Sequence, residues 1–232
     1  MTSIKHTHLV LFDIDGTLVH CGATPIRVFK QALLEVFGAA GPIDNWIFDG
    51  KTDPMIVQEL MSAAVVYCSR EMTDKALEIY ATNLQTELPK APDKIIYPGV
   101  RELLEELTKR PVLLGLLTGN IKQGARAKLE SLDLWKHFSF GAFAGDSAVR
   151  KELADIAVQR AFELSGQKFS GRQIVIVGDT EYDINCGRHL GVKAIGVGTG
   201  RSSAAKLLEH GADIAFEDFS DHLKAAREIL EG

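Results

Sequence analysis

Short, continuous apolar runs alternate with amphipathic segments from about residue 97 to the end of the chain. Continuous apolar runs predict strands that are buried on both faces, and apolar residues three and four apart predict helices. Such alternation is typical of a parallel sheet that helices cover on both sides. The predicted strands of this part are 112–119, 138–143, 173–179, 193–200 and 212–216, and the predicted helices are 100–110, 121–134, 151–166, 181–191, 202–211 and 219–230.

The part of the chain before residue 97 has a different pattern. Residues 7–12 form one apolar run, which predicts a further strand of the same sheet, but residues 23–89 show helical periodicity and little strand character. We therefore expect an α/β core of residues 1–18 and 97–232 with a small all-helical cap inserted at 19–96. The helices of the insert are predicted at 25–38, 53–68 and 73–88, with Asp53 and Thr73 as N-caps of the second and third.

Composition narrows the classes of function. The 232-residue chain is 46% hydrophobic and 25% charged, which is ordinary for a globular protein. Its net charge is −5 and its basic residues are scattered, so we expect no nucleic-acid partner. No apolar run approaches the length of a membrane helix, and three widely spaced cysteines without a CxxC pair favour a reducing compartment. We expect a cytoplasmic protein without a membrane partner, either a monomer or a homodimer.

Two carboxylates follow the first predicted strand, in the stretch LVLFDIDGTLVH. Side chains alternate faces in an extended chain, so Asp13 and Asp15 are predicted to point the same way. Two like charges side by side are unfavourable unless a cation, a proton or a reacting group is present. Gly16 permits a sharp turn or the close approach of a ligand. Taken alone, the stretch is equally compatible with an ordinary Asp-Gly turn.

Two other predicted strands also end in polar residues. Thr118, Gly119 and Asn120 end one strand, and Asp179 and Asp183 follow another. Each group alone could be a turn or a helix cap. Right-handed crossovers, however, place the loops after parallel strands at one edge of the sheet, where ligands bind. The sequence therefore predicts a single site at this edge, shared by the three strand ends.

With these motifs the chain resembles the haloacid dehalogenase superfamily of hydrolases. Within that superfamily it resembles the phosphoglycolate phosphatase-like members, whose helical cap is inserted after the first strand. DIDGTLV resembles the first motif of the family, LLTGN the second and GDTEYD the fourth, in the family's order. The resemblance spans the chain and implies a Rossmann-like core, a phosphate-ester hydrolase activity and Mg²⁺ as the cofactor.

The resemblance implies a role for each acid. Asp13 would be the nucleophile that forms an aspartyl-phosphate, and Asp15 would protonate the leaving group and then accept a proton from water. Mg²⁺ would be held by the Asp13 carboxylate, the Asp15 backbone carbonyl and the Asp179 carboxylate, a set of hard oxygen ligands that suits this ion. Asp183 would orient a metal-bound water.

The resemblance also implies a set of phosphate-binding groups. The Thr118 hydroxyl and the backbone amides of Gly119 and Asn120 would hold the oxygens of the transferring phosphoryl group. Gly16 and Thr17 would lie at the substrate, where the chain leaves the sheet toward the cap.

The third motif of the family is a lysine or arginine near the start of a helix, and here two residues are available. Arg150 and Lys151 are adjacent in GDSAVRKELADIAV, which lacks the proline that commonly accompanies this motif. We favour Arg150 as the cation that pairs with phosphate and nucleophile, and keep Lys151 as the alternative. In the insert, Lys51 of FDGKTDPM is a candidate substrate contact, although this loop is equally compatible with a turn that leads into a helix.

The sequence therefore predicts a Mg²⁺-dependent phosphomonoesterase that acts on a small phosphorylated metabolite, with the insert as a lid. Two alternatives remain open: a β-phosphoglucomutase-like phosphotransferase, and a binding protein that keeps the fold without turnover. Haloacid dehalogenase chemistry is disfavoured because Asp15 is an acid that those dehalogenases lack. The substrate itself is not specified by the motifs.

Overall fold

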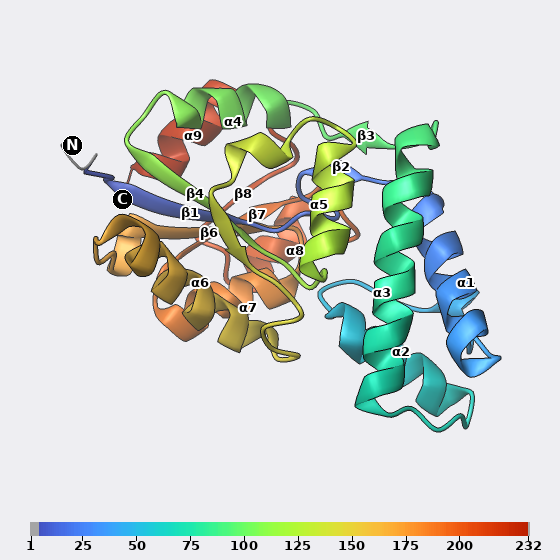
Figure 1. The fold of residues 1–232 in the computed structure, drawn as a ribbon. Helices are drawn as coiled ribbons and strands as arrows, with labels where there is room; N and C mark the ends of the chain where they lie inside the picture. The colour runs from blue at the N-terminus through green and yellow to red at the C-terminus, as the bar shows by residue number, and fades with distance from the viewer. Residues whose placement is uncertain (1–4, 232) are drawn as a thin grey trace.

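The computed structural model describes residues 5–231. Its main sheet contains β1 (His8–Phe12), β4 (Val112–Leu117), β5 (Phe140–Ala142), β6 (Ile174–Gly178), β7 (Lys193–Val197) and β8 (Ile214–Phe216). All neighbours in the sheet are parallel, in the order β5-β4-β1-β6-β7-β8. The first strand of the chain therefore lies inside the sheet, between strands that come much later (Figure 1). The predicted α/β, Rossmann-like architecture is confirmed.

Helices cover both faces of this sheet (Figure 1). They are α4 (Val100–Thr108), α5 (Lys122–Glu130), α6 (Arg150–Ser165), α7 (Glu181–Leu190), α8 (Ala204–Glu209) and α9 (His222–Leu230). The alternation of side chains along β1 explains the two layers. Val10 and Phe12 share one buried cluster with residues of α4 and α9, whereas Leu9 and Leu11 belong to a second cluster with residues of α6.

Three α-helices between residues 20 and 95 of the chain stand beside the sheet rather than on its faces (Figure 1). They are α1 (Thr24–Phe37), α2 (Asp53–Ala63) and α3 (Arg70–Glu87). All three fall within 19–96, the segment proposed as the cap, and we use that name for it below. The chain enters and leaves this segment through β2 (Val19–His20) and β3 (Ile95–Ile96), which pair antiparallel. This short pair was not predicted from the sequence.

The boundaries of α2 and α3 differ from the prediction. The helix predicted at 53–68 ends at Ala63, and Val65 adopts a positive φ of 57°, which is incompatible with a continuing helix. The N-cap of α3 is Ser69, whose hydroxyl accepts a hydrogen bond from the Met72 amide at 3.2 Å. Thr73 is therefore wrong as an N-cap, since it already lies inside the first turn.

Asp53 is also wrong as an N-cap. Thr52 has the extended backbone of the N-cap position, and Asp53 is the first residue of α2. Its carboxylate instead accepts a hydrogen bond of 2.7 Å from the Ile121 amide, beyond the end of β4. Asp is a common N-cap residue, but here Asp53 instead connects the inserted segment 19–96 to the core.

Among the described residues 5–231, no helix has the length and apolar character that a membrane crossing requires.

Candidate active site

The three predicted motifs meet at one edge of the sheet. β1, β4 and β6 are adjacent and parallel, so Asp13, Thr118 and Asp179 follow the same ends of neighbouring strands. All three are buried, and they line one cavity. Because the topology fixes this arrangement, positions far apart in the sequence are brought together without any contribution from the loops that separate them.

Three buried carboxylates form the centre of the site. Asp13, Asp179 and Asp183 each offer an oxygen, and these oxygens lie within 4.8 Å of one another. Arg150 reaches into the cluster: its guanidinium lies 3.0 Å from Oδ1 of Asp13 and 2.5 Å from Oδ1 of Asp183. Both the arginine and the acids are almost completely removed from solvent. One cation therefore faces three buried acids.

The charge imbalance is visible in the pKa values. Burial raises the pKa of Asp13 to about 6, against the opposing effect of Arg150 and with a further rise from Asp183 and Asp15. Burial and the neighbouring acids also hold the pKa of Asp179 well above its ordinary value. Several carboxylate oxygens converge at a point where negative charge is unfavourable, which is the donor set that a hard divalent cation such as Mg²⁺ fits.

Two loops hold Asp179 in place. Thr17 donates a hydrogen bond of 3.0 Å to Oδ1 of Asp179. Gly16 has a φ of 84°, and a Cβ there would lie 2.2 Å from Oδ2 of the same carboxylate. A Cβ on Gly200 would lie only 1.8 Å from that oxygen. The hydroxyl of Thr199 donates to the Gly16 carbonyl at 2.5 Å, so the two loops are joined.

The loop 198–200 is thus close to the acid cluster, although no motif of the sequence pointed to it. Its GVGTG stretch has the glycines of a tight loop but not the spacing of a dinucleotide motif. The glycine at position 200 is required by the close approach of Asp179, and that contact depends on how β6 and β7 align.

Asp183 is fixed by the start of α7. Its Oδ2 accepts hydrogen bonds from the backbone amide and the hydroxyl of Thr180, at 3.1 and 2.6 Å, and this reciprocal pattern is a capping box. The other oxygen, Oδ1, accepts from Arg150. Asp183 is therefore both the third helical residue of the capping box, whose N-cap is Thr180, and the partner that holds the arginine against Asp13.

Asp15 lies in different surroundings from Asp13. β1 ends at Phe12, so the alternation of an extended strand does not run through both acids. Oδ2 of Asp15 lies 2.6 Å from the ammonium of Lys128 and 2.8 Å from Nδ2 of Asn120. The Lys128 ammonium also donates to Oδ1 of Asn120 at 2.7 Å. The three side chains form a closed triangle of polar contacts.

Lys128 is a further residue of the site that the sequence did not predict. Lys128 lies on α5, and the residue as a whole is only 5% exposed. Burial alone would lower the pKa of this lysine, but the surrounding Asp15, Tyr80, Cys21 and Asp53 side chains raise it above the ordinary value, so the ammonium stays charged. A signal was present, because the position shares the face of α5 that also buries Gly124, Ala125 and Leu129.

The two candidate cations of the third motif lie in different surroundings. Arg150 begins α6 and points into the acid cluster, whereas Lys151 is exposed. The buried Nε of Arg150 has no hydrogen-bond partner among the described residues, so this guanidinium retains an unsatisfied donor. Arg150 is accordingly the cation that we place in the site.

The second motif connects the site to the cap. Thr118 is fully buried, and its hydroxyl accepts hydrogen bonds from the backbone amide and Nδ2 of Asn120, at 3.3 and 2.8 Å. The Gly119 carbonyl accepts a bond of 2.8 Å from the Asp53 amide. A Cβ on Gly119 would lie 2.1 Å from the Lys51 carbonyl, so this glycine permits close contact between the core and the cap.

The cap closes a cavity of about 440 Å³ over the acids. Phe29, Ile56 and Tyr80 contribute apolar and aromatic surface from the three cap helices. Lys51 also lines the cavity, but its ammonium pairs with Glu59 at 2.5 Å. Burial raises the pKa of Asp53, which faces the same cavity, to about 6, against the opposing effects of Lys128 and the Ile121 amide.

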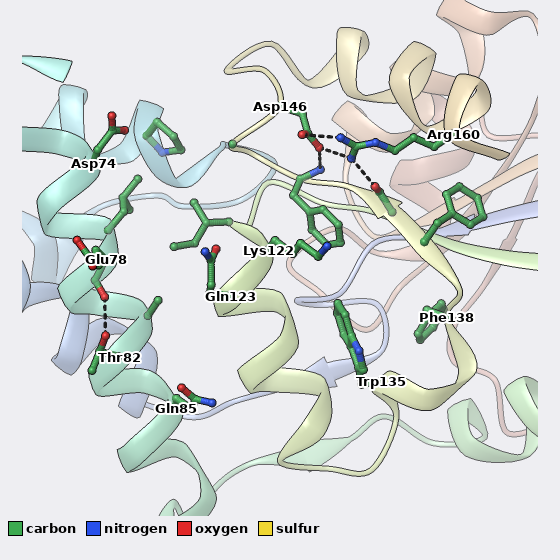
Figure 2. Close-up of a pocket in the computed structure, with 18 of the residues that line it drawn as sticks. Asp74, Glu78, Thr82, Gln85, Lys122, Gln123, Trp135, Phe138, Asp146 and Arg160 are labelled. Carbon is green, nitrogen blue, oxygen red and sulfur yellow. Dashed lines mark hydrogen bonds and ion pairs between the residues drawn. The ribbon is translucent and has the colours of Figure 1, made fainter. Parts of the chain in front are cut away.

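A second cavity, of about 940 Å³, lies between α3 and the core and contains none of the motif acids (Figure 2). In it Arg160 points at Asp146 and forms two hydrogen bonds with its carboxylate, at 2.6 and 2.8 Å. Trp135 and Phe138 add aromatic surface to the lining of the cavity. This cavity is larger, but Arg160 and Asp146 satisfy each other there, and the acid cluster lies elsewhere, so we place the chemistry in the smaller cavity.

Comparison with known proteins identifies the family. The family model for Haloacid dehalogenase-like hydrolase matches residues 10–197. The chain belongs to this family. Among curated proteins of the family, the phosphoglycolate phosphatase of Pseudomonas fluorescens (strain Pf0-1) is 25% identical over 217 residues, which cover 90% of this chain and 76% of that protein. The resemblance drawn from the motifs is confirmed.

Solved structures of family members share the fold. A predicted phosphoglycolate phosphatase from Haemophilus somnus 129PT superposes with a TM-score of 0.70 at 20% identity, covering 95% of this chain and 98% of that chain. CbbY from Rhodobacter sphaeroides, solved in complex with phosphate, gives a TM-score of 0.68 at 15% identity, covering 93% and 96%. At these identities the likeness shows the haloacid dehalogenase-like fold.

Proposed function

We propose that the chain is a phosphomonoesterase that hydrolyses a small phosphorylated metabolite through an aspartyl-phosphate on Asp13. One observation carries the proposal: the Asp13 carboxylate, paired with Arg150, lines a cavity of about 440 Å³ that the cap covers. A cavity of this size suits a small ligand rather than a polymer. Relatives named phosphoglycolate phosphatase support a phosphate ester as the substrate class.

In the first step an oxygen of Asp13 attacks phosphorus. Arg150, 3.0 Å from Oδ1 of Asp13, fixes the orientation of the nucleophile and offsets the charge of the approaching phosphoryl group. Asp183 keeps the guanidinium in this position. The Thr118 hydroxyl and the amides of the following loop are our proposed donors to the phosphoryl oxygens.

Asp15 is our proposed proton carrier. It gives a proton to the leaving oxygen as Asp13 is phosphorylated, and then takes a proton from the water that hydrolyses the aspartyl-phosphate. Its side chain is 44% exposed at the cavity, so it can reach a leaving group that the buried Asp13 cannot. The cap would exclude bulk water during these steps.

The acid cluster fits Mg²⁺. We propose that the Asp13 and Asp179 carboxylates and the Asp15 backbone carbonyl would hold the ion, with Asp183 beside them. A bound Mg²⁺ would offset the charge of these acids and of the phosphoryl group. The hydrogen bond from Thr17 orients Asp179 for this purpose. The three cysteines are free thiols, which is typical of a reducing compartment, so we extend the proposal to the cytoplasm.

Turnover of 4-nitrophenyl phosphate tests the proposal. With Mg²⁺, wild type is expected to release 4-nitrophenolate, and Asp13→Asn is expected to lose activity by about 10⁴-fold or more, because it removes the nucleophile. Asp74→Asn, which changes an exposed acid on α3, serves as the matched control. Mass spectrometry of rapidly quenched wild type should show a phosphoryl adduct on the peptide that contains Asp13.

The proposal fails if wild type turns over no faster than Asp13→Asn. If wild type is active, a screen over phosphorylated sugars, two- and three-carbon acids and nucleotides identifies the substrate class. An aspartyl-phosphate that survives in water and transfers to a sugar would instead support the phosphotransferase alternative.

A further inference from the structure

We propose that Lys128 is a positioning residue for proton transfer, which clamps Oδ2 of Asp15 so that Oδ1 is left to face the leaving group. The inference rests on the proposed phosphomonoesterase function and extends it to a residue outside the sequence motifs. It follows from three features of the Asp15 side chain: its contacts, its exposure and the cover above it.

The contacts of Asp15 are one-sided. Oδ2 receives the ammonium of Lys128 at 2.6 Å and Nδ2 of Asn120 at 2.8 Å. Oδ1 has no hydrogen-bond partner among residues 5–231. A carboxylate with two strong donors on one oxygen cannot rotate freely, because rotation would break both contacts. Oδ1 is therefore the oxygen that remains available to a ligand.

The clamp is rigid because its members are buried and joined to each other. The side chain of Lys128 is 7% exposed, compared with 44% for Asp15. A lysine ammonium has three donors, and two of those of Lys128 are used by Asp15 and Asn120. Asn120 in turn donates to Thr118. The charged end of Lys128 is thus fixed to the second motif, while Asp15 keeps one face open to the cavity.

The cap covers this clamp. The ring of Tyr80, on α3, lies against α5, where a Cβ on Gly124 would be 3.5 Å from it. Tyr80 and Asp53 line the same cavity as Lys128. Lys128 is therefore enclosed between the acid that it holds and the helices of the cap, and it does not extend toward solvent as most lysines do.

This arrangement assigns the proton to one atom. As the bond between Asp13 and phosphorus forms and the bond from phosphorus to the leaving oxygen breaks, the proton on Oδ1 of Asp15 passes to that oxygen, which departs as an alcohol. In the second step a water oxygen attacks phosphorus, its proton passes to Oδ1, and the Asp13 carboxylate is released with inorganic phosphate. The lysine keeps its own proton in both steps.

A leaving-group series tests the role of Lys128. Phenyl phosphate needs a proton on its leaving oxygen, whereas 2,4-dinitrophenyl phosphate releases a stable phenolate without one. Lys128→Met is expected to lower kcat/KM about 100-fold for phenyl phosphate and by less than about threefold for 2,4-dinitrophenyl phosphate, since a positioned general acid contributes typically 10²–10⁴-fold. If Lys128 has a purely structural role, Lys128→Met should lower kcat/KM equally for both substrates.

Three further variants complete the experiment. Lys122→Met removes the same charge from an exposed position of α5 and should leave both substrates unaffected. Asn120→Ala removes the second donor to Oδ2 without burying an unpaired charge, and should show the same selective loss, smaller in size. It therefore tests the clamp even if Lys128→Met does not fold. In an Asp15→Asn background, Lys128→Met should add little further loss, because the two act as one unit.

The outcomes separate this inference from the proposed function. Equal losses on both phosphates, or full additivity with Asp15→Asn, would overturn the clamp while leaving the phosphomonoesterase intact. If wild type hydrolyses neither phosphate, the proposed function itself is wrong.

Discussion

Asp13 and Asp15 are separated by one residue, yet they lie in two different regions of the site. Asp13 belongs to a region with Arg150, Asp179 and Asp183, in which all four side chains are buried. Asp15 belongs to a half-exposed region that faces the cap and is held by Lys128. One strand end can therefore supply two acids in contrasting surroundings, a buried one that suits the proposed nucleophile and an accessible one that suits the proposed proton carrier.

The backbone explains how the two regions separate. The Asp13 amide still donates to the Val177 carbonyl at 3.0 Å, so Asp13 continues the pairing of β1 with β6. Ile14 is fully buried, and Asp15 forms a bridge with Val19 at the start of the connection to the cap. Asp13 therefore belongs to the sheet, and Asp15 to the turn that leaves it.

Replacement of Arg150 has the largest effect that we expect within this comparison. Arg150→Ala should lower kcat/KM by about 10³-fold, because removing one preorganised donor to a developing charge typically costs 10²–10³-fold and Arg150 also orients Asp13. The loss should be the same for phenyl and 2,4-dinitrophenyl phosphate, in contrast to that of Lys128→Met. Steady-state kinetics with both substrates measures it.

Lys151→Ala is the matched control for this prediction. Lys151 is the next residue on α6 but is exposed, so its loss should change kcat/KM by less than about twofold. A large loss in Lys151→Ala, with little in Arg150→Ala, would reverse the assignment of the third motif.

The second prediction concerns Asp53, which is buried but lines the same cavity as Asp15. Burial raises its pKa from 3.8 to about 6. A carboxyl whose pKa is higher in the folded chain stabilises the fold at low pH, and this contribution is lost as the pH rises from the unfolded value through the folded one. Asn keeps an acceptor for the Ile121 amide but cannot ionise.

Asp53→Asn should therefore match wild type near pH 4 and exceed it at pH 7 by about 3 kcal/mol in free energy of unfolding, the value of a shift of about two pKa units. Urea denaturation at pH 4, 5, 6 and 7 measures the difference between the two proteins. A difference that stays constant with pH would contradict the buried, raised carboxyl. The comparison between variants removes the contribution of Asp13, whose pKa is raised as well.

The smallest effect that we expect is on metal affinity. Gly200→Ala places a Cβ 1.8 Å from Oδ2 of Asp179, so that carboxylate must move. The Mg²⁺ concentration for half-maximal activity should rise about tenfold, since changes beside metal ligands typically cost 10–100-fold in affinity. Gly145→Ala, where a Cβ has nothing within 4 Å, is the control. An unchanged Mg²⁺ requirement would mean that Asp179 is not a ligand.

The sequence predicted the parts of the site that depend on topology. Asp13, Thr118 and Asp179 end apolar runs, and parallel strands bring such ends together whatever lies between them. Lys128 was missed because a lysine on an amphipathic helix is normally solvated, so its position on the buried face of α5 was not taken as a sign of burial. The choice between Arg150 and Lys151 depends on where α6 begins, which the residues alone do not fix to one position.

The cap boundaries were predictable only in outline. Helical periodicity located α1, α2 and α3, but not the N-cap of α3 at Ser69 or the end of α2 at Ala63. The pairing of β2 with β3 covers two residues on each strand, too few to produce a pattern. Asp53 shows the limit most clearly, since its partner, Ile121, lies in another part of the chain.

The pairing of β2 with β3 makes the two ends of the inserted segment neighbours. Val19 pairs with Ile96 and His20 with Ile95, and the Ala23 amide donates to the Asp93 carboxylate at 2.9 Å. A unit whose ends are adjacent can be exchanged without pulling apart the strands that it interrupts. The inserted segment is therefore expected to be exchangeable. A short turn, or a different inserted domain, could replace the helical segment. Such a replacement would change substrate recognition while the buried acids stayed in place.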